Sequence, residues 1–574
     1  MHTIAIVGAG ESGVQLALEL HRNGYAVTLI SDRGPAEILT GNVMSSQCVF
    51  SGALAVQAPL EISSVTPVDP DSPEVQLERI SLTLTGAESL GWSSPLDSPA
   101  RSVDQRVKCS VWITDFVSEG GTLLIEKVTV GRLEELTRVH DLVVVSTGKG
   151  ELGQIFTTDR SRSPFDKPQR ALALTYVIGV EPDAEPGIRM TIKPGVGEFF
   201  TFPGITTSGL CQMMVFEGVP DGPMDCWTSV TSPAEHLQKS LEILAEHFPD
   251  EAARFTHAQL TDDGGTLRGW ITPTVRHAVG TLPSGRHVFG LGDAVVLNDP
   301  LTGQGSNTAT MAARYYHDAI VRQGDKPFDQ QWMKRTFDEF WRGWAQWSVS
   351  WTNSMLKPLK EHQINLLRAA EQHPALAGAI ASGFDDPRTL FPWWYDAAEA
   401  AEFTEQMAAE DTSAFDLRDY RSALGQFATG VTVVTTRGAD GRKVGITANS
   451  FTSVSMDPPL VLWCPSSRAP SLGAFAESTH FAVNLLSSGQ HVLSRQFATP
   501  SDDKFAGVLT RNGIGGIPIL EGTVATFECR TVARYTSGDH EIYIGEVESY
   551  DAPGGDPLVF HGGAYHATAT HPDF

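Results

Sequence analysis

Three glycines near the amino end have the spacing of a dinucleotide-binding turn. They are Gly8, Gly10 and Gly13. The pattern predicts an apolar strand just before them and a helix over residues 14–22 just after them. Such glycines permit a tight turn close to a pyrophosphate, whose charge then faces the helix N-terminus. Asp32, at the end of the next predicted strand, is placed to accept a hydrogen bond from a ribose hydroxyl. This βαβ pattern predicts a nucleotide site but leaves FAD and NAD open.

A second glycine-rich segment, far downstream of the first, favours FAD. Gly292 and Asp293 follow a predicted strand, where a carboxylate can bind the polyol chain of a flavin. The loop that follows brings backbone N–H groups and a new helix N-terminus to the same dinucleotide. An NAD dehydrogenase has no use for this second site, so we expect a flavin. The expected contacts in the loop are Pro300, Gly303, Gln304, Gly305 and Asn307.

The carboxy-terminal part contains a run of short polar side chains at a predicted strand end. The run is Thr447, Ala448, Asn449 and Ser450. These residues offer many hydrogen-bonding groups with little bulk, which suits the phosphate and ring edge of a flavin. Alone, such a run is more often an ordinary polar loop. The order of the surrounding segments is what favours a binding site.

The hydrophobic pattern changes twice along the chain and predicts how the motifs are positioned. Residues 171–217 alternate apolar and polar, which predicts an antiparallel sheet in a substrate lobe of about 165–280. Residues 331–409 predict mostly helix. Tryptophans recur there at three- and four-residue steps, and we expect ordinary core packing for this stripe. They are Trp341, Trp344, Trp347 and Trp351.

The pattern near residue 400 predicts a boundary between two domains. An Ala- and Glu-rich stretch there predicts a helical linker, and from Tyr420 onward short strands with turn signals predict a small β-barrel. We therefore expect a first domain over residues 1–400, with a helical segment over about 330–400. A linker over 401–416 and a second domain over 417–574 follow.

Composition limits the class of protein. The 574 residues carry a formal net charge of −26, which argues against nucleic acid as a partner because phosphate binding needs Lys and Arg. Six scattered cysteines without a C-x-x-C pair predict no disulfide scaffold and no metal site, and they favour the reducing cytoplasm. The opening strand leaves no room for a signal peptide. No run of about 18 apolar residues predicts a membrane span.

The first domain resembles the glutathione-reductase-like fold of FAD hydroxylases, and more closely the styrene monooxygenase epoxidase family. Besides the two glycine motifs, the matching segments are 101–104, 146–149 and 163–172, of which the last is the most specific. The resemblance places Arg101 among the FAD contacts. Neither Asp221-Gly222 nor Asp263-Gly264 has the apolar context of the NADPH motif of self-reducing hydroxylases. We therefore expect that this domain cannot reduce its own flavin.

The resemblance also implies a reaction. Reduced FAD would react with O₂ to a C4a-hydroperoxide, whose distal oxygen attacks an electron-rich C=C bond. An apolar, closed pocket would matter more than a catalytic acid or base, because water promotes loss of H₂O₂. The family places residues 42–48 along the flavin ring, which makes Gln47 a candidate catalytic residue. The family carries Asn where this chain has Gln47, so the flavin-face contacts and the substrate preference can differ here.

The second domain resembles the short-chain flavin reductases that supply two-component monooxygenases. The resemblance covers about residues 417–567 and implies a split β-barrel that commonly forms a homodimer. It places the 447–450 run and the loop with Ser467 and Arg468 against the flavin. It places Gly538, Asp539 and His540 on the nicotinamide side, so that His540 would position NADH. Hydride then passes directly to the flavin, which requires stacking geometry rather than an acid or base.

Together the two resemblances imply a self-sufficient fusion of α/β fold class. An FAD epoxidase would receive reduced FAD from an attached NADH:flavin reductase. The expected substrates are O₂ and a small aromatic alkene, with styrene or indole first. An aromatic hydroxylase of the same two-component type is the alternative, although we find no base that would ionise a phenol. A flavin-binding redox sensor is a third hypothesis, which two complete flavin sites in one chain disfavour.

Overall fold

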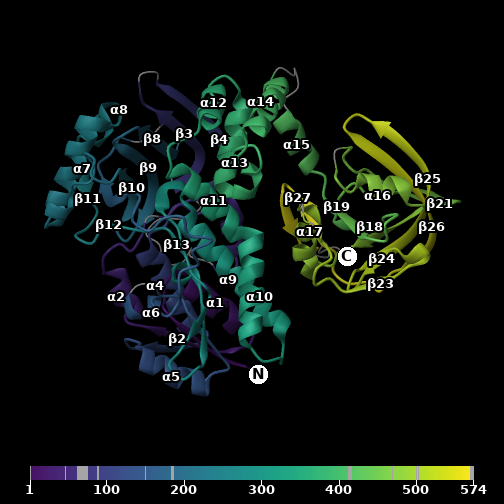
Figure 1. Ribbon diagram of the computed structural model, residues 1–574, viewed down its shortest axis with the longest axis horizontal. Helices are drawn as coiled ribbons and strands as arrows, with labels where there is room; N and C mark the ends of the chain where they lie inside the picture. Colours follow the sequence, from purple (N-terminus) through teal and green to yellow (C-terminus); the bar gives the residue numbers. More distant parts are fainter. Residues whose placement is uncertain are drawn as a thin grey trace, which may run out of the picture. The chain divides into compact units, whose positions relative to one another are not determined.

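The chain folds as two units, Met1–Thr412 and Ser413–Phe574, which are described separately (Figure 1). The structure is a computed structural model. It describes residues 2–45, 47–60, 75–86, 89–148, 150–181, 186–411, 417–467, 469–499, 501 and 503–568. In this part of the chain, no helix combines the length and the apolar character that crossing a membrane requires.

The first sheet of the N-terminal unit consists of short apolar strands that are mostly buried on both faces. In order across the sheet they are β14 (Val279–Thr281), β15 (His287–Gly290), β6 (Leu142–Val145), β1 (Thr3–Val7), β2 (Ala26–Ser31) and β5 (Thr122–Ile125). All neighbours except β14 and β15 pair in parallel. Helix α1 (Glu11–Arg22) follows β1 and packs against α9 (Gln304–Gln323). Because the carboxyl ends of parallel strands meet at one edge, the glycine motifs after β1 and β15 share that edge.

The second sheet is larger and contains the predicted antiparallel segment. In order its strands are β11 (Gln259–Leu260), β7 (Ala171–Ile178), β10 (Gly209–Gly218), β9 (Gly197–Thr206), β8 (Gly187–Lys193), β3 (Gln76–Leu84) and β4 (Leu90–Arg101), and β12 (Thr266–Trp270) also pairs with β7. Strands β7, β10, β9 and β8 are antiparallel, as predicted. The sequence analysis did not assign β3 and β4 to this sheet. Much of β4 is exposed and rich in Ser, Pro and Asp, which hides its alternation.

The two faces of the second sheet have different partners. One face packs against helix α7 (Pro233–His247), and its residues include Ala173, Phe199, Met214 and Phe216. The opposite face is also apolar, and its residues are Leu174, Tyr176, Phe200, Phe202, Met213 and Val215. We call these six residues the inner face. They belong to one core cluster with Phe50, Leu301 and Trp351, which come from other elements of the unit.

Helices cover the region after the second glycine motif, as predicted for residues 331–409. They are α10 (Gln330–Phe340), α11 (Gln346–Met355), α12 (Glu361–Ala369), α13 (Pro374–Asp385) and α14 (Ala397–Asp411). A turn of π-helix, Trp341–Ala345, joins α10 to α11. Trp344 and Trp351 are buried in the core, as the packing prediction expects. Trp341 is only partly buried and stacks with Arg162, whose guanidinium carbon lies 4.4 Å from the ring centre.

The C-terminal unit is built on one antiparallel sheet. In order its strands are β19 (Lys443–Ala448), β18 (Thr432–Arg437), β22 (His480–Leu485), β25 (Ala525–Ser537), β26 (His540–Asp551), β21 (Pro459–Trp463) and β20 (Thr452–Met456). The short strands predicted after Tyr420 are therefore present. Helix α15 (Leu417–Gly425) precedes them, and α16 (Leu472–Glu477) and α17 (His491–Ala498) lie between them along the chain. The core of this sheet includes Trp463, Phe481 and Tyr543.

A buried charge network fixes helix α4 (Gln105–Ser118) against the second sheet. The Asp104 carboxylate caps α4 by accepting from the Arg106 N–H at 2.8 Å, and it accepts the Thr206 hydroxyl at 2.8 Å. Arg106 donates to Asp104 at 2.9 Å, to Asp262 at 2.8 Å and to the Gly41 carbonyl at 3.0 Å. Hydrogen bonds to Asp262 and Asp104 raise the pKa of Arg106 although burial opposes this. The network therefore depends on a permanently charged guanidinium.

We expect Arg106→Met to destabilise the N-terminal unit by about 3–5 kcal/mol, because it leaves the fully buried Asp104 without a counter-charge. Denaturant unfolding followed by tryptophan fluorescence measures the change. Lys239→Met is the control, because Lys239 forms an ion pair with Glu242 on the exposed side of α7. An exposed pair contributes little, so this variant should unfold like the parent. Equal effects of the two substitutions would contradict the role of the network.

Candidate active site

The first glycine motif forms a tight turn between β1 and α1. Gly8 has a φ of 110°, which favours glycine, and a Cβ on Gly13 would lie 2.1 Å from the Gly8 carbonyl oxygen. A Cβ on Gly10 would instead meet nothing within 4 Å. The turn is therefore closed toward the protein and open at Gly10, which fits a phosphate group approaching the N-terminus of α1. Asp32 is exposed at the end of β2, beside Arg33.

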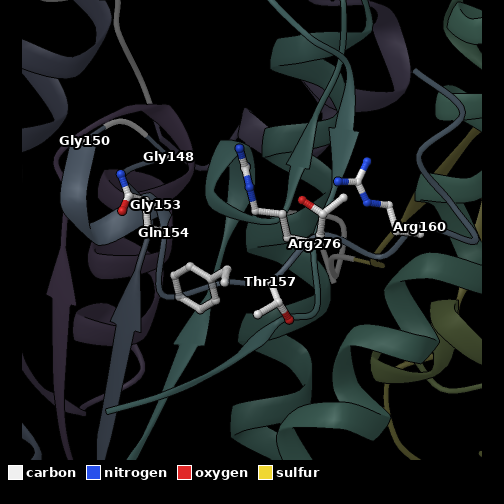
Figure 2. Close-up of a pocket in the computed structure, with 9 residues that line it drawn as sticks. Gly148, Gly150, Gly153, Gln154, Thr157, Arg160 and Arg276 are labelled. Atoms are coloured by element: carbon white, nitrogen blue, oxygen red, sulfur yellow. The ribbon is translucent and has the colours of Figure 1, made fainter. Parts of the chain in front are cut away.

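The second motif begins where the segment after β15 passes close to the segment after β6. Gly292 has a φ of 58°, and a Cβ on Gly148, which follows β6, would lie 2.5 Å from the Asp293 carbonyl oxygen. Arg276 donates to the same carbonyl at 3.1 Å. A cavity of about 510 Å³ borders this close approach (Figure 2). Its lining residues include Gly148, Gly150, Gly153, Thr157, Arg160 and Arg276. Among the described residues no carboxylate lines the cavity, whereas Arg160 and Arg276 do, which suits an anionic group.

The side chains at the start of α9 are engaged with the protein. Gly303 has a φ of 65° and caps the helix, and a Cβ on Gly305 would meet nothing within 4 Å. Pro300 begins the short 3₁₀ turn Pro300–Thr302 just before this cap. Gln304 donates to the Phe384 carbonyl at 2.7 Å. Asn307 donates to the Cys48 carbonyl at 2.9 Å and accepts from the Phe50 N–H at 2.9 Å. Both amide atoms of Asn307 are thus occupied, so its predicted cofactor contact requires the backbone, whereas the amide oxygen of Gln304 has no partner among the described residues.

Residues 41–50, which include the predicted flavin-ring segment, are held by side chains and backbone from several elements. The Val43 N–H donates to the Gly264 carbonyl at 2.9 Å, and the Tyr176 hydroxyl donates to the Ser45 carbonyl at 3.4 Å. Val49 and Arg101 exchange backbone hydrogen bonds at 2.9 Å. The contacts of Arg106 and Asn307 described above fix the two ends. None of these positioning contacts has a local sequence signal, and only Arg101 and Asn307 were expected near the cofactor.

Gln47 lies in this segment and differs from its neighbours. Its side chain is 1% exposed, yet neither its amide nitrogen nor its amide oxygen has a hydrogen-bond partner among the described residues. Leaving such groups unpaired costs about 1–3 kcal/mol each. Cys48 and Phe50, which follow it, belong to the same core cluster as the inner face. Among the described residues the Gln47 amide has no protein partner, and it adjoins an apolar cluster. Its two polar atoms could therefore hydrogen-bond to the polar edge of a cofactor ring.

Three segments that were predicted to form the reductase site are connected in the C-terminal unit: residues 447–450, the loop after β21, and the turn that contains Asp539. Ser450 accepts from the Cys464 N–H at 2.9 Å, which ties the 447–450 run to the loop after β21. In that loop, the N–H and hydroxyl of Ser467 both donate to the Asp539 carbonyl at 2.9 Å. Thr447 and Ala448 end β19 next to Asn449, which is exposed. Arg468 lies outside the described residues.

The Gly-Asp-His motif forms the turn between β25 and β26. Gly538 has a φ of 62°, and His540 pairs with Ser466 across the loop. The His540 ring Nδ1 lies 2.7 Å from an Asp539 carboxylate oxygen, and about half of the His540 side chain is exposed. The ring is thus oriented by Asp539 and accessible to a ligand. Hydrogen bonds and one β-bridge therefore link the loop after β21 to Ser450 on one side and to Asp539 and His540 on the other.

Comparison with known proteins assigns a family to each unit. Residues 148–254 match the family model described as "Styrene monooxygenase A putative substrate binding domain", and residues 424–569 match "Flavin reductase like domain". The chain is 27% identical over 395 residues to styrene monooxygenase StyA of Pseudomonas fluorescens, an alignment that covers 67% of this chain and 93% of that protein. It is 48% identical over 148 residues to FMN reductase (NADH) SmoA of Agrobacterium fabrum, with 26% and 84% covered.

Solved structures resemble the C-terminal unit. The NADH:FAD oxidoreductase SgcE6 of Streptomyces globisporus C-1027 is 40% identical, with 28% of this chain and 91% of that chain covered and a TM-score of 0.26. Both family models therefore match within one polypeptide, in the order that the sequence analysis predicts. The C-terminal unit thus belongs to the flavin reductase family, and the chain as a whole is a styrene monooxygenase-like, flavin-dependent monooxygenase fused to a flavin reductase.

Proposed function

We propose that the N-terminal unit epoxidises styrene-like aryl alkenes, and also indole, with O₂ and FAD that the C-terminal unit reduces with NADH. The observation that carries this proposal is the buried, unpartnered amide of Gln47 beside the apolar inner face. Reduced FAD, when bound, would supply the electrons that activate O₂, and one oxygen atom of O₂ would be transferred to the alkene. The chain's own residues hold the flavin ring against a dry, apolar chamber, where an alkene without polar groups binds by burial.

The proposed cofactor contacts follow from the open sides of the two glycine motifs. Gly8, Gly10 and Gly13 would hold the pyrophosphate, and Asp32 and Asp293 would accept from the ribose and the ribityl chain. In the C-terminal unit, residues 447–450 and Ser467 would hold the flavin, and His540 would orient the nicotinamide. The finer fold assignments belong to this proposal: a glutathione-reductase-like FAD domain over 1–400, a linker over 401–416, and a split β-barrel over 417–574 that dimerises.

Fusion gives this arrangement a kinetic advantage. Free reduced flavin reacts with O₂ in solution, and H₂O₂ then forms instead of product. A tether keeps the source and the acceptor of reduced FAD at an effective concentration of up to about millimolar. We propose that the chain acts in the cytoplasm, where NADH is available.

The purified full chain with NADH, FAD and styrene should give styrene oxide, and ¹⁸O₂ should label the epoxide oxygen. Product analysis of several aryl alkenes and phenols, with H₂O₂ measured in parallel, is the test. Steady NADH oxidation that yields only H₂O₂ from every alkene would refute the epoxidase. Ring-hydroxylated phenols without any epoxide would identify an aromatic hydroxylase instead.

Gln47→Leu should have opposite effects on the flavin-free and the flavin-bound protein. It removes two unpaired buried polar atoms, so the flavin-free N-terminal unit should gain about 1–3 kcal/mol. The rise in unfolding midpoint that FAD causes should become smaller, because a contact is lost. Gln57→Leu is the control, since the Gln57 amide donates to Glu11 at 2.9 Å and to Thr310 at 2.6 Å. That variant should only be destabilised. If Gln47→Leu instead lowers the free energy of unfolding as Gln57→Leu does, and FAD raises the unfolding midpoint as much as in the parent, Gln47 does not contact the flavin.

His540→Leu should raise KM for NADH by about tenfold and leave FAD binding to the C-terminal unit unchanged, because the ring is placed to orient the nicotinamide. Initial rates of NADH oxidation at saturating FAD give KM and kcat separately. His566→Leu, at an exposed position of β28 (Ala564–His566), serves as the control. A parallel loss of FAD affinity would show that His540 belongs to the flavin side.

A further inference from the structure

Four charged side chains are buried together beside the inner face. Arg170 makes a forked contact with Glu198, with N–O distances of 2.7 and 2.8 Å. Glu217 lies opposite Glu198 in the pairing of β10 with β9. Glu217 and Asp299 are fully buried, and Arg170 and Glu198 are less than 10% exposed. The cluster therefore sets three carboxyl groups against one guanidinium. Among the described residues, no group of three or more acidic, His or Cys side chains is arranged to hold a metal ion.

Glu217 and Asp299 touch each other and have few other partners. Each carboxyl group acts on the pKa of the other, so the two lie close together. Within the described residues, neither Glu217 oxygen nor Asp299 Oδ2 has a donor group as a hydrogen-bond partner, and Asp299 Oδ1 accepts only from the Leu301 N–H at 3.2 Å. Two carboxyl groups in contact can form a hydrogen bond only if one of them carries a proton. The Arg170 charge is already matched by Glu198.

Electrostatics identifies the proton-carrying group. Burial raises the pKa of Glu217 well above its usual range, and the negative charge of Asp299 raises it further. Burial also raises the pKa of Asp299, to about 6, while the hydrogen bonds from Glu217 and Leu301 lower it. Glu198 and Arg170 are the other charged groups that act on the pair, with opposite effects. Asp299 also accepts the Leu301 N–H, which favours its ionised form, whereas Glu217 has no such donor among the described residues, so we assign the shared proton to Glu217.

The pair connects the inner face to the second flavin motif. Glu217 lies two residues beyond Val215 on β10, so its side chain points to the same face as Val215 and Met213. Asp299 directly precedes the Pro300–Thr302 turn, which leads into Gly303 and α9. Thus the pair stands between the apolar inner face and the loop expected at the flavin.

We propose that the Glu217–Asp299 pair stores the proton that the oxygenation consumes. This inference rests on the proposed function. Alkene, O₂, NADH and H⁺ give epoxide, NAD⁺ and water: one oxygen atom bonds to the alkene, and the other is reduced by the electron pair from NADH. The stored proton passes to the oxygen that leaves as water, and solvent then reprotonates the pair. A chamber that excludes water needs such an internal source.

Infrared spectroscopy of the flavin-free full chain tests the stored proton directly. Glu217→Gln should remove one carboxylic acid C=O band from the spectrum of the parent. Asp299→Asn should shift that band, because the acceptor changes from a carboxylate to an amide. Glu251→Gln is the control, since Glu251 is equally buried but is ion-paired with Arg189 and Arg254. That substitution should leave the band in place. A Glu217→Gln spectrum identical to that of the parent would overturn the proposal.

The pH dependence of stability gives a second readout without flavin. Glu217 holds its proton more tightly in the folded than in the unfolded chain, so its contribution is present at low pH and is lost as pH rises. The unfolding midpoint of Glu217→Gln should therefore rise relative to that of the parent as pH increases above the usual titration range of glutamate. Parallel curves for the two proteins in calorimetry would contradict the inference.

Turnover completes the test. With NADH, FAD and styrene, Glu217→Gln should oxidise NADH at the parental rate, because the reductase unit is unchanged. Epoxide per NADH should fall at least about tenfold, with H₂O₂ making up the difference. The epoxide yield of the parent should decline as rising pH removes the shared proton from the pair. The epoxide yield of Glu217→Gln should be low at every pH. A parental yield and pH profile in Glu217→Gln would refute the role. A parent that shows the infrared band but makes no epoxide would refute the proposed epoxidase function. It would still confirm that Glu217 and Asp299 share a proton.

Discussion

The chain from Gly41 to Phe50 depends on a buried guanidinium. Most of this stretch has no regular secondary structure, and hydrogen bonds from other elements hold it in place. Arg106 binds the Gly41 carbonyl and, through Asp262, the turn whose Gly264 carbonyl accepts from Val43. Without this charge, the segment would lose its anchor to the second sheet. The flavin-ring position and the apolar chamber would then lack a defined wall.

Much of the fold could be predicted because its signals are local. The glycine turn between β1 and α1 needs only a few consecutive residues, and its conformation follows from steric limits on Gly8 and Gly13. The period-two pattern of residues 171–217 likewise reports two-sided burial within each strand. The tryptophan stripe was correctly interpreted as core at Trp344 and Trp351, because helical spacing alone indicates a buried face.

The remainder could not be predicted because it depends on contacts between distant residues. Asn307 was expected to contact the cofactor, but its amide is occupied by Cys48 and Phe50, which lie far away in sequence. The cluster of Arg170, Glu198, Glu217 and Asp299 spans two strands and two loop segments, and each member alone resembles an ordinary surface charge in the sequence. Strands β3 and β4 were missed since β4 is largely exposed and its pattern is weak. Predicting these features requires the tertiary structure, which brings them together.

Strict alternation along β9 and β10 gives each strand two independent sets of side chains. Phe200, Phe202, Met213 and Val215 belong to the inner face, whereas Phe199, Met214 and Phe216 hold helix α7. Substitutions at every second position would therefore change the core on one side of the sheet and leave the side chains that contact α7 in place. The two layers that share these strands can vary independently of each other.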